Sequence, residues 1–139
     1  MTEIEHQVEL SAEETAIYES IRRAALEKLG NNSRGQGTNK LAILAELTKL
    51  RRLCCDARLV VPEVRIESFK LAAFSELMAE LVSSGHRALV FSQFVDVLKL
   101  AGKALESSCK TYQYLDGSSS TKQRAAAVDA FQAGEGDAF

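Results

Sequence analysis

The apolar positions of the first third of the chain recur every three to four residues. Between residues 11 and 29 this spacing predicts an amphipathic helix, with apolar positions Ile17, Ile21, Ala24, Ala25 and Leu29. Ser11 and Glu14 have the spacing of a capping box at its start. A second stripe predicts a helix over residues 40–54, along Leu44, Leu47, Leu50 and Cys54. Residues 30–39 hold three glycines and no large apolar side chain, so we expect a mobile loop there.

From residue 68 onward, helical stripes alternate with short apolar runs. A helix is predicted from the capping residue Ser68 to Gly85, followed by the continuous run Ala88–Phe91, which suits a strand buried on both faces. Helical spacing returns over residues 95–105, and residues 111–115 predict a second strand. A last helix is expected from Ser120 to Phe131, with Ser120 and Gln123 as its capping box. This order indicates a parallel βαβ unit in an α/β fold.

Two strands alone make a poor parallel sheet. A parallel pair needs neighbouring strands, and an open strand edge pairs readily with another chain. We therefore expect a truncated domain that either self-associates at the open edge or has that edge covered by another segment.

Composition and charge restrict the class of protein. The 139 residues, 46% hydrophobic and 26% charged, suit one small globular unit. We expect a cytoplasmic protein, or a nuclear one if eukaryotic, because the sequence has neither a membrane-length apolar run nor a secretion signal. Seventeen basic against nineteen acidic residues give a net charge of −2, so a surface for nucleic acid must be local.

The sequence offers no catalytic constellation. Three cysteines form neither a C-x-x-C pair nor a disulfide framework, and with two histidines they predict reduced, mostly buried thiols and no metal site. His86 has no evident partner and is expected at the surface. A phosphate loop, a metal-binding carboxylate pair and a nucleophile turn are all absent from the sequence.

Two strand-to-helix turns are the candidate binding sites. In an open α/β sheet, ligands bind beyond the carboxyl ends of the strands. Ser92-Gln93-Phe94 follows the first predicted strand, and residues 116–120 follow the second. Small polar side chains and N–H groups at a helix N-terminus are suited to an anion such as a phosphate. The simpler interpretation is that Ser92 and Ser120 are only caps and that Asp116-Gly117 is only a turn.

A basic cluster lies near the end of the second predicted helix. It consists of Lys49, Arg51, Arg52 and Arg58. These side chains are able to contact a phosphate backbone, but a solvated helix face is the simpler explanation, so the cluster is a weak candidate site.

A series of segments resembles, in order and spacing, the Swi/Snf family of helicase-like, DNA-dependent ATPases of superfamily two. The segments cover essentially the whole chain: Val8–Ser11, Ile17-Tyr18, Leu47–Cys55, Ser68–Leu71, Arg87–Phe94, Tyr114–Ser118 and Arg124–Phe131. Leu89–Phe94 is similar to the family's motif IV, and Leu115–Ser118 with Arg124 is similar to the segment that follows it. Asp56-Ala57 and Ser119-Ser120 depart from the family's usual loop sequences. The string Cys54-Cys55-Asp56 resembles bacterial more than eukaryotic members of the family.

The resemblance implies a partial RecA-like lobe of the P-loop NTPase type. Residues 63–139 would form the N-terminal part of the second lobe, truncated before motif V, with Phe139 as the first residue of the next strand. Residues 1–62 would form a helical segment that leads into the lobe and carries the mobile loop 30–39.

The resemblance also implies a function. Family members hydrolyse ATP, with Mg, between two lobes and translocate on double-stranded DNA. Because the phosphate loop, the metal-holding carboxylates and the arginine finger are absent here, this chain alone is expected to be inactive and to hold no cofactor. Its expected partners are duplex DNA and the first lobe of the same parent, with no membrane.

By the same resemblance, the turns would contact the DNA backbone. Ser92 and Gln93 would approach it from the motif IV turn, with Gly117 and Ser118 nearby, and Arg124 would support the site or touch a phosphate. The alternative is a non-enzymatic interaction module that holds a protein partner on the helical face of residues 11–54.

Overall fold

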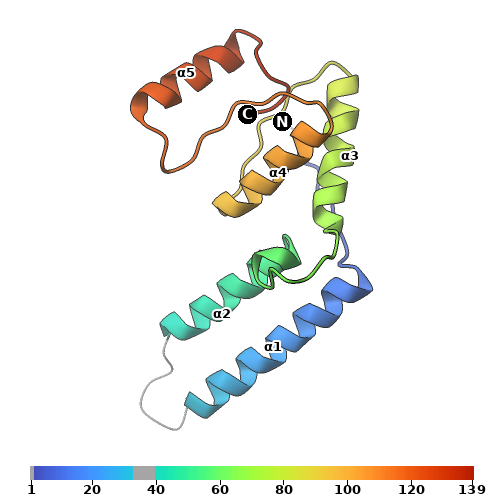
Figure 1. Cartoon of the computed structure of the whole chain (residues 1–139), viewed down its shortest axis with the longest axis vertical. Coiled ribbons are helices and arrows are strands. Elements are labelled where there is room, and N and C mark those ends of the chain that lie inside the picture. Colours follow the sequence, from blue (N-terminus) through green and yellow to red (C-terminus); the bar gives the residue numbers. More distant parts are fainter. Residues whose placement is uncertain (1, 33–39) are drawn as a thin grey trace. The chain divides into compact units, whose positions relative to one another are not determined.

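The computed structural model describes residues 2–32 and 40–139, which form two compact units, 1–72 and 73–139 (Figure 1). In the described residues the chain forms α-helices α1 (Ala12–Asn32), α2 (Lys40–Leu53), α3 (Phe69–Ser83), α4 (Val95–Ser107) and α5 (Thr121–Gln132), and a 3-10 turn, η1 (Ala57–Leu59). The predicted helices are all present. Of the loop expected over residues 30–39, residues 33–39 lie outside the described residues, and Gly30 belongs to α1.

In the first unit, the capping box of α1 is formed as predicted. The hydroxyl of Ser11 accepts a hydrogen bond from the Glu14 N–H at 3.1 Å, and the Glu14 carboxylate accepts one from the Ser11 N–H at 2.8 Å. Glu14 is buried, so this bond compensates the burial of a polar side chain at the start of the helix.

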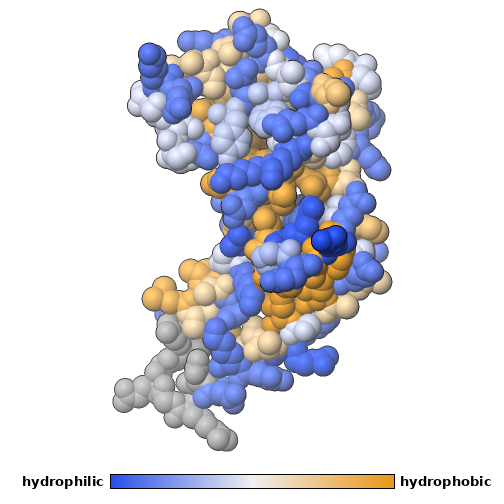
Figure 2. Space-filling model, in the orientation of Figure 1, coloured by the Kyte–Doolittle hydropathy of each residue, from blue (hydrophilic) through white to orange (hydrophobic). Residues whose placement is uncertain are grey.

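Helices α1 and α2 lie side by side as a hairpin (Figure 1). Lys28 on α1 donates to the Glu46 carboxylate on α2 at 2.7 Å, while Ala25 and Leu53 are buried. Leu44 and Leu47, from whose spacing α2 was predicted, remain 60% and 52% exposed. Apolar side chains accordingly reach the surface over this hairpin (Figure 2). The apolar stripe correctly predicted a helix but not its burial.

The chain after α2 forms a tightly bonded connection in which Asp56 and Ser68 are buried. Asp56 caps η1 by accepting from the Arg58 N–H, and it also binds the Arg58 guanidinium through both carboxylate oxygens, at 2.9 and 2.6 Å. The Ser68 hydroxyl donates to the Cys55 carbonyl at 2.8 Å and accepts from the Leu71 N–H at the start of α3. Asp56 thus stabilises the turn itself.

The second unit is built around three extended segments that run in the same direction. Residues 137–139 lie between residues 88–90 and 111–113, with parallel bridges from Ala138 to both Ala88 and Tyr112. The core consists of Met78, Leu105 and Ala138, against which partly buried residues of α3 and of the outer segments pack. The two predicted strands therefore do not pair with each other, because the chain's last residues separate them.

These contacts are isolated bridges rather than full strands. Backbone hydrogen bonding to residues 137–139 involves residues 88–90 on one side and 111–113 on the other. The short pairing explains why the predicted strands 88–91 and 111–115 appear as extended segments, and the structure does not establish a parallel βαβ unit. Among the described residues, no helix has the length and apolar character to cross a membrane.

Helix α5 is capped as predicted and held at its far end by aromatic contacts. Ser120 and Gln123 form a reciprocal capping box. The Arg87 guanidinium donates to the Phe131 carbonyl and lies 4.6 Å from the centre of the Phe131 ring. The Phe131 ring is in turn 5.4 Å from that of Phe139. These contacts connect the end of α5 to the central extended segment.

Candidate nucleic-acid interface

The two predicted binding turns leave the same end of the extended segments. Ala88 and Tyr112 are both paired in parallel with Ala138, so residues 88–90 and 111–113 run in one direction. Ser92 and Gly117 each follow the carboxyl end of one of these segments. This is the arrangement that a ligand site beyond the strand ends requires.

The first turn is organised by Ser92. Its hydroxyl accepts a hydrogen bond from the Phe94 N–H at 3.1 Å. Phe94 is the N-cap residue of α4 and makes no side-chain capping bond. Ser92 is half-buried and Gln93 is exposed. The predicted cap at Ser92 is therefore a bond within the turn, not an N-cap of the helix.

The second turn is organised by Asp116, which belongs to the candidate turn but was not among the residues expected to contact DNA. One carboxylate oxygen accepts from both the hydroxyl and the N–H of Ser118, at 2.6 and 2.8 Å, and the other accepts from the Tyr114 hydroxyl at 2.9 Å. The bonds from Ser118, followed by that from Tyr114, hold the pKa of Asp116 below its usual range. An Asp followed two residues later by Ser is the sequence signal for this type of turn.

Arg124 braces the same turn from the first turns of α5. Its guanidinium donates to the Asp116 carbonyl at 2.8 Å and to the Ser119 carbonyl at 3.1 Å. A guanidinium has five N–H groups, so these two bonds leave donors for a ligand. Arg124 is exposed, and the position of a β-carbon on Gly117 has no atom within 4 Å. The tip of the turn is therefore open to a large ligand.

The electrostatics of this turn differ from those expected. Ser118 was predicted to offer its donors to a phosphate, but its N–H and hydroxyl are both bound to the Asp116 carboxylate. The negative charge of that carboxylate opposes a phosphate at the same place. Lys99 is near enough to lower the pKa of Asp116 further, and Arg124 adds a second positive charge.

The predicted basic cluster is not a uniform surface. Arg58 is bound through its guanidinium to the buried Asp56, and this bond raises the pKa of Arg58. Lys49 and Arg52 line a cavity of about 580 Å³ with apolar side chains of α2. The cluster belongs to the first unit and both turns belong to the second.

The described residues contain no group of three His, Cys, Asp or Glu side chains that is able to hold a metal ion. Cys54, Cys55 and Cys109 are free thiols, and burial raises the pKa of Cys54. Cys54 and Cys55 are half-buried and Cys109 is exposed, so the thiols are less buried than expected, and His86 lies at the surface as predicted.

Comparison with known proteins identifies relatives of the whole chain. The family described as "Helicase conserved C-terminal domain" matches residues 70–139, about half of the chain. YwqA of Bacillus subtilis (strain 168), named as an ATP-dependent helicase/translocase, is 28% identical over 90% of this chain. CHROMATIN REMODELING 5 of Arabidopsis thaliana is 28% identical over 95% of it.

A solved structure has a similar fold. The Sulfolobus solfataricus SWI2/SNF2 ATPase C-terminal domain superposes with a TM-score of 0.79 at 24% identity, covering 90% of this chain and 55% of that one. The chain spans 14% of the length of the Bacillus relative and 8% of that of the Arabidopsis relative. The chain therefore belongs to the helicase conserved C-terminal domain family, and its fold is similar to that of a SWI2/SNF2 ATPase C-terminal domain.

Proposed function

We propose that this chain contributes DNA-backbone contacts and part of the lobe scaffold to an ATP-dependent DNA translocase. The observation that carries the proposal is the convergence of two polar turns, at Ser92 and at Gly117, on one end of three parallel extended segments. Backbone contacts of this kind are independent of base sequence and weaken as salt is added.

The proposed contacts differ between the turns. Ser92 and Gln93 approach the DNA backbone from the segment before α4. At the second turn, Gly117 lets a DNA phosphate approach the protein backbone. Arg124 donates its remaining N–H groups to that phosphate while it holds the turn. Ser118 contacts a phosphate only if its bonds to Asp116 are exchanged.

We further propose that the parent protein binds ATP and Mg and hydrolyses ATP, while this chain alone is inactive. The names of the relatives, a helicase/translocase and an ATPase domain, support this proposal for the parent. The sequence of this chain lacks a phosphate loop, on which phosphoryl transfer in such enzymes depends. We also propose that residues 88–91, α4 and residues 111–115 form a parallel βαβ unit in the intact lobe, next to the parent's first lobe. A cytoplasmic, bacterial parent remains our prediction.

The proposal is tested by fluorescence anisotropy of two labelled DNA duplexes of unrelated sequence with the full chain. We expect weak binding of equal strength to both, with an affinity that falls as salt rises. Absence of binding at low salt, or a clear preference for one duplex, would contradict backbone recognition by this chain.

A second candidate function is a protein-interaction module on the first unit. Leu41, Leu44 and Leu47 are 76%, 60% and 52% exposed on α2, beside the cavity that Lys49 and Arg52 line. Exposed apolar patches of this kind are typical of protein interfaces. Substituting Leu44 by Lys separates the two functions, because it should abolish partner binding by the hairpin and leave DNA binding by the second unit unchanged.

A further inference from the structure

The cavity of about 580 Å³ beside α2 is open to solvent. Two leucines on its wall, Leu41 and Leu44, are 76% and 60% exposed. The helix residues that line it have the spacing of a single face of α2: Leu41, Leu44, Ala45 and Thr48. Leu59 and Val60, at the end of η1, complete its apolar lining. We call this open cavity the α2 groove.

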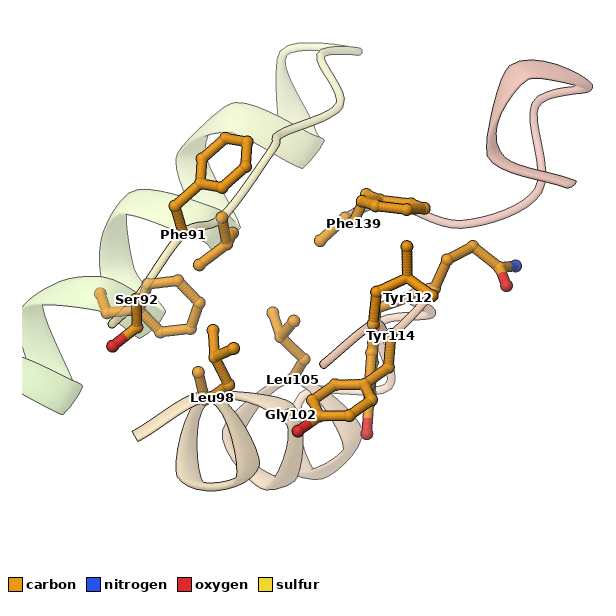
Figure 3. Close-up of a pocket in the computed structure, with 14 residues that line it drawn as sticks. Phe91, Ser92, Leu98, Gly102, Leu105, Tyr112, Tyr114 and Phe139 are labelled. Carbon is orange, nitrogen blue, oxygen red and sulfur yellow. The ribbon is translucent and has the colours of Figure 1, made fainter. Parts of the chain in front are cut away.

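The α2 groove differs in its charges from the hollow of about 250 Å³ in the second unit. Leu98 and Leu105 point into that hollow from α4, and its lining contains no charged side chain (Figure 3). The lining of the α2 groove contains Lys49 and Arg52 and, among the described residues, no acidic side chain. The groove therefore combines an apolar wall with positive charge.

The rest of α2 reinforces this positive charge. Four basic side chains lie on the helix, at positions 40, 49, 51 and 52, against one acidic side chain, that of Glu46. The Glu46 carboxylate already accepts a hydrogen bond from Lys28 of α1 at 2.7 Å. The field at the groove thus favours acidic groups, although the whole chain has a net charge of −2.

The backbone around the groove favours a helix over an extended peptide as its occupant. The N–H groups of Leu59 and Val60 donate to the carbonyls three residues earlier, each at 3.1 Å. The Thr48 hydroxyl donates to the Leu44 carbonyl at 2.8 Å, and the helical hydrogen bonds of α2 use the N–H groups around it. An extended peptide would leave its own backbone groups unpaired here, whereas a helix pairs them internally.

We propose that the α2 groove binds an acidic, amphipathic helix of a partner protein. This inference rests on the second candidate function and names the chemistry of its partner. Apolar side chains on one face of the partner helix pack against Leu41, Leu44 and Val60, and its carboxylates lie beside Lys49 and Arg52. Burial of the exposed leucines favours binding, while the two positive charges select an acidic partner.

Duplex DNA is a poorer fit to the same groove. Its phosphates pair with Lys49 and Arg52, but two cations give weak binding to a phosphate backbone. The exposed leucines beside them would also gain little from contact with phosphates. The combination of leucines and cations is therefore better matched by a helix that carries both apolar and acidic side chains.

The test measures the fluorescence anisotropy of two labelled peptides with the full chain. The acidic peptide is Glu-Ala-Leu-Glu-Glu-Leu-Leu-Ala-Glu-Leu-Glu-Ala-Leu-Leu-Glu, and in the basic peptide every Glu is replaced by Lys. Both carry the same apolar stripe at helical spacing. We expect the acidic peptide to bind about tenfold more tightly at low salt, with a difference that shrinks as salt rises. The net charge of the chain would favour the basic peptide, so this preference reports the local charge.

Substitutions in the chain locate the bound peptide. Leu44→Gln, which leaves the charge unchanged, should weaken binding of the acidic peptide about tenfold. Leu26→Gln, at a position 57% exposed on α1 and outside the groove lining, should bind like the original chain. Circular dichroism verifies that the variants are folded.

A charge reversal tests the selection of the partner. Lys49→Glu should weaken binding of the acidic peptide about fivefold and strengthen that of the basic peptide. Lys103→Glu, at an exposed position of α4, changes the net charge equally and should alter neither affinity.

The possible failures have different meanings. Equal binding of the two peptides, or equal effects of Lys49→Glu and Lys103→Glu, would overturn the acidic partner and leave the interaction module standing. Binding of neither peptide would overturn both. Displacement of the acidic peptide by duplex DNA, undiminished in Leu44→Gln, would assign the cations to DNA. Self-association that Leu44→Gln abolishes would identify a second copy of the chain as the occupant, which also contradicts the proposal.

Discussion

The guanidinium of Arg124 donates a 2.8 Å hydrogen bond to the backbone carbonyl of Asp116, eight residues earlier in the chain. A second bond from the same guanidinium reaches the Ser119 carbonyl. The turn between them is therefore fixed from both ends, and its open tip at Gly117 faces solvent. In the structure, Arg124 therefore holds the turn in place, and its proposed contact with DNA depends on that turn.

Asp116→Asn should strengthen DNA binding a few-fold at low salt. Asparagine retains an oxygen that accepts from Ser118, so the turn is kept while a negative charge near the proposed phosphate is removed. Anisotropy titrations at low and high salt measure the change. Asp129→Asn, an exposed position on α5, is the matched control for loss of an acidic charge. If both substitutions raise the DNA affinity equally, the gain comes from the change in net charge and not from the position of Asp116.

Stability should fall in acid through Asp116 and Asp137. Their pKa values are lowered, that of Asp116 by the bonds from Ser118 and that of Asp137 mainly by the Thr111 N–H. A carboxyl whose pKa is lower in the folded state stabilises above its unfolded pKa of about 3.9 and loses this effect as pH falls through the folded value.

Urea denaturation followed by circular dichroism between neutral pH and pH 3 tests this dependence. We expect little change in stability at higher pH and a loss below about pH 4. Asp116→Asn and Asp137→Asn should each flatten the acid limb. If neither variant changes it, the assignment of the pH dependence to these carboxylates is wrong.

Gly102→Ala should destabilise the second unit. A β-carbon at this position lies 2.7 Å from the Tyr112 hydroxyl oxygen, so Tyr112 must move, at a cost of about 1–3 kcal/mol. Tyr112→Phe should relieve part of the clash, giving a favourable coupling in the double variant. Gly30→Ala, in α1 with no atom near its β-carbon position, should instead stabilise by about 0.5–1 kcal/mol.

Ser68→Ala should destabilise the connection before α3 by about 1–2 kcal/mol, because it removes a helix cap and leaves the Cys55 carbonyl without its donor. Ser83→Ala removes an exposed hydroxyl bonded to the Glu80 carbonyl and should change stability by less than about 0.5 kcal/mol. Denaturation midpoints of the two variants measure the contrast. Equal midpoints would show that the buried Ser68 bonds contribute little.

Local sequence patterns predicted the helices well because the residues that form each helix and its cap lie close together in the sequence. The capping box at Ser120 and Gln123 is an example, since both partners lie within four residues of each other. The order of the extended segments was not predictable in this way. Residues 137–139 lie between segments that precede them by tens of residues, and nothing in the apolar runs indicates that order.

The placement of the two candidate turns was predicted from the sequence, but the hydrogen bonds within them were not, and their contact with DNA stays a prediction. The turns at Ser92 and Gly117 follow from the strand-to-helix pattern. The use of the Ser118 donors by Asp116, and the brace formed by Arg124, depend on how the turn closes in three dimensions. The apolar stripe of α2 likewise did not predict how exposed the helix is, because Leu44 and Leu47 remain 60% and 52% exposed among the described residues.

The central claim is that the turn held by Arg124 contacts the DNA backbone. Comparing the DNA binding of two matched α5 variants tests it most directly. Arg124→Ala removes the brace, and Lys122→Ala removes one positive charge from an exposed position two residues away. Anisotropy titrations at low salt should show affinity reduced about tenfold by Arg124→Ala and only slightly by Lys122→Ala, with Arg124→Lys not restoring full affinity. Equal losses for Arg124→Ala and Lys122→Ala, or full affinity in Arg124→Ala, would contradict the account.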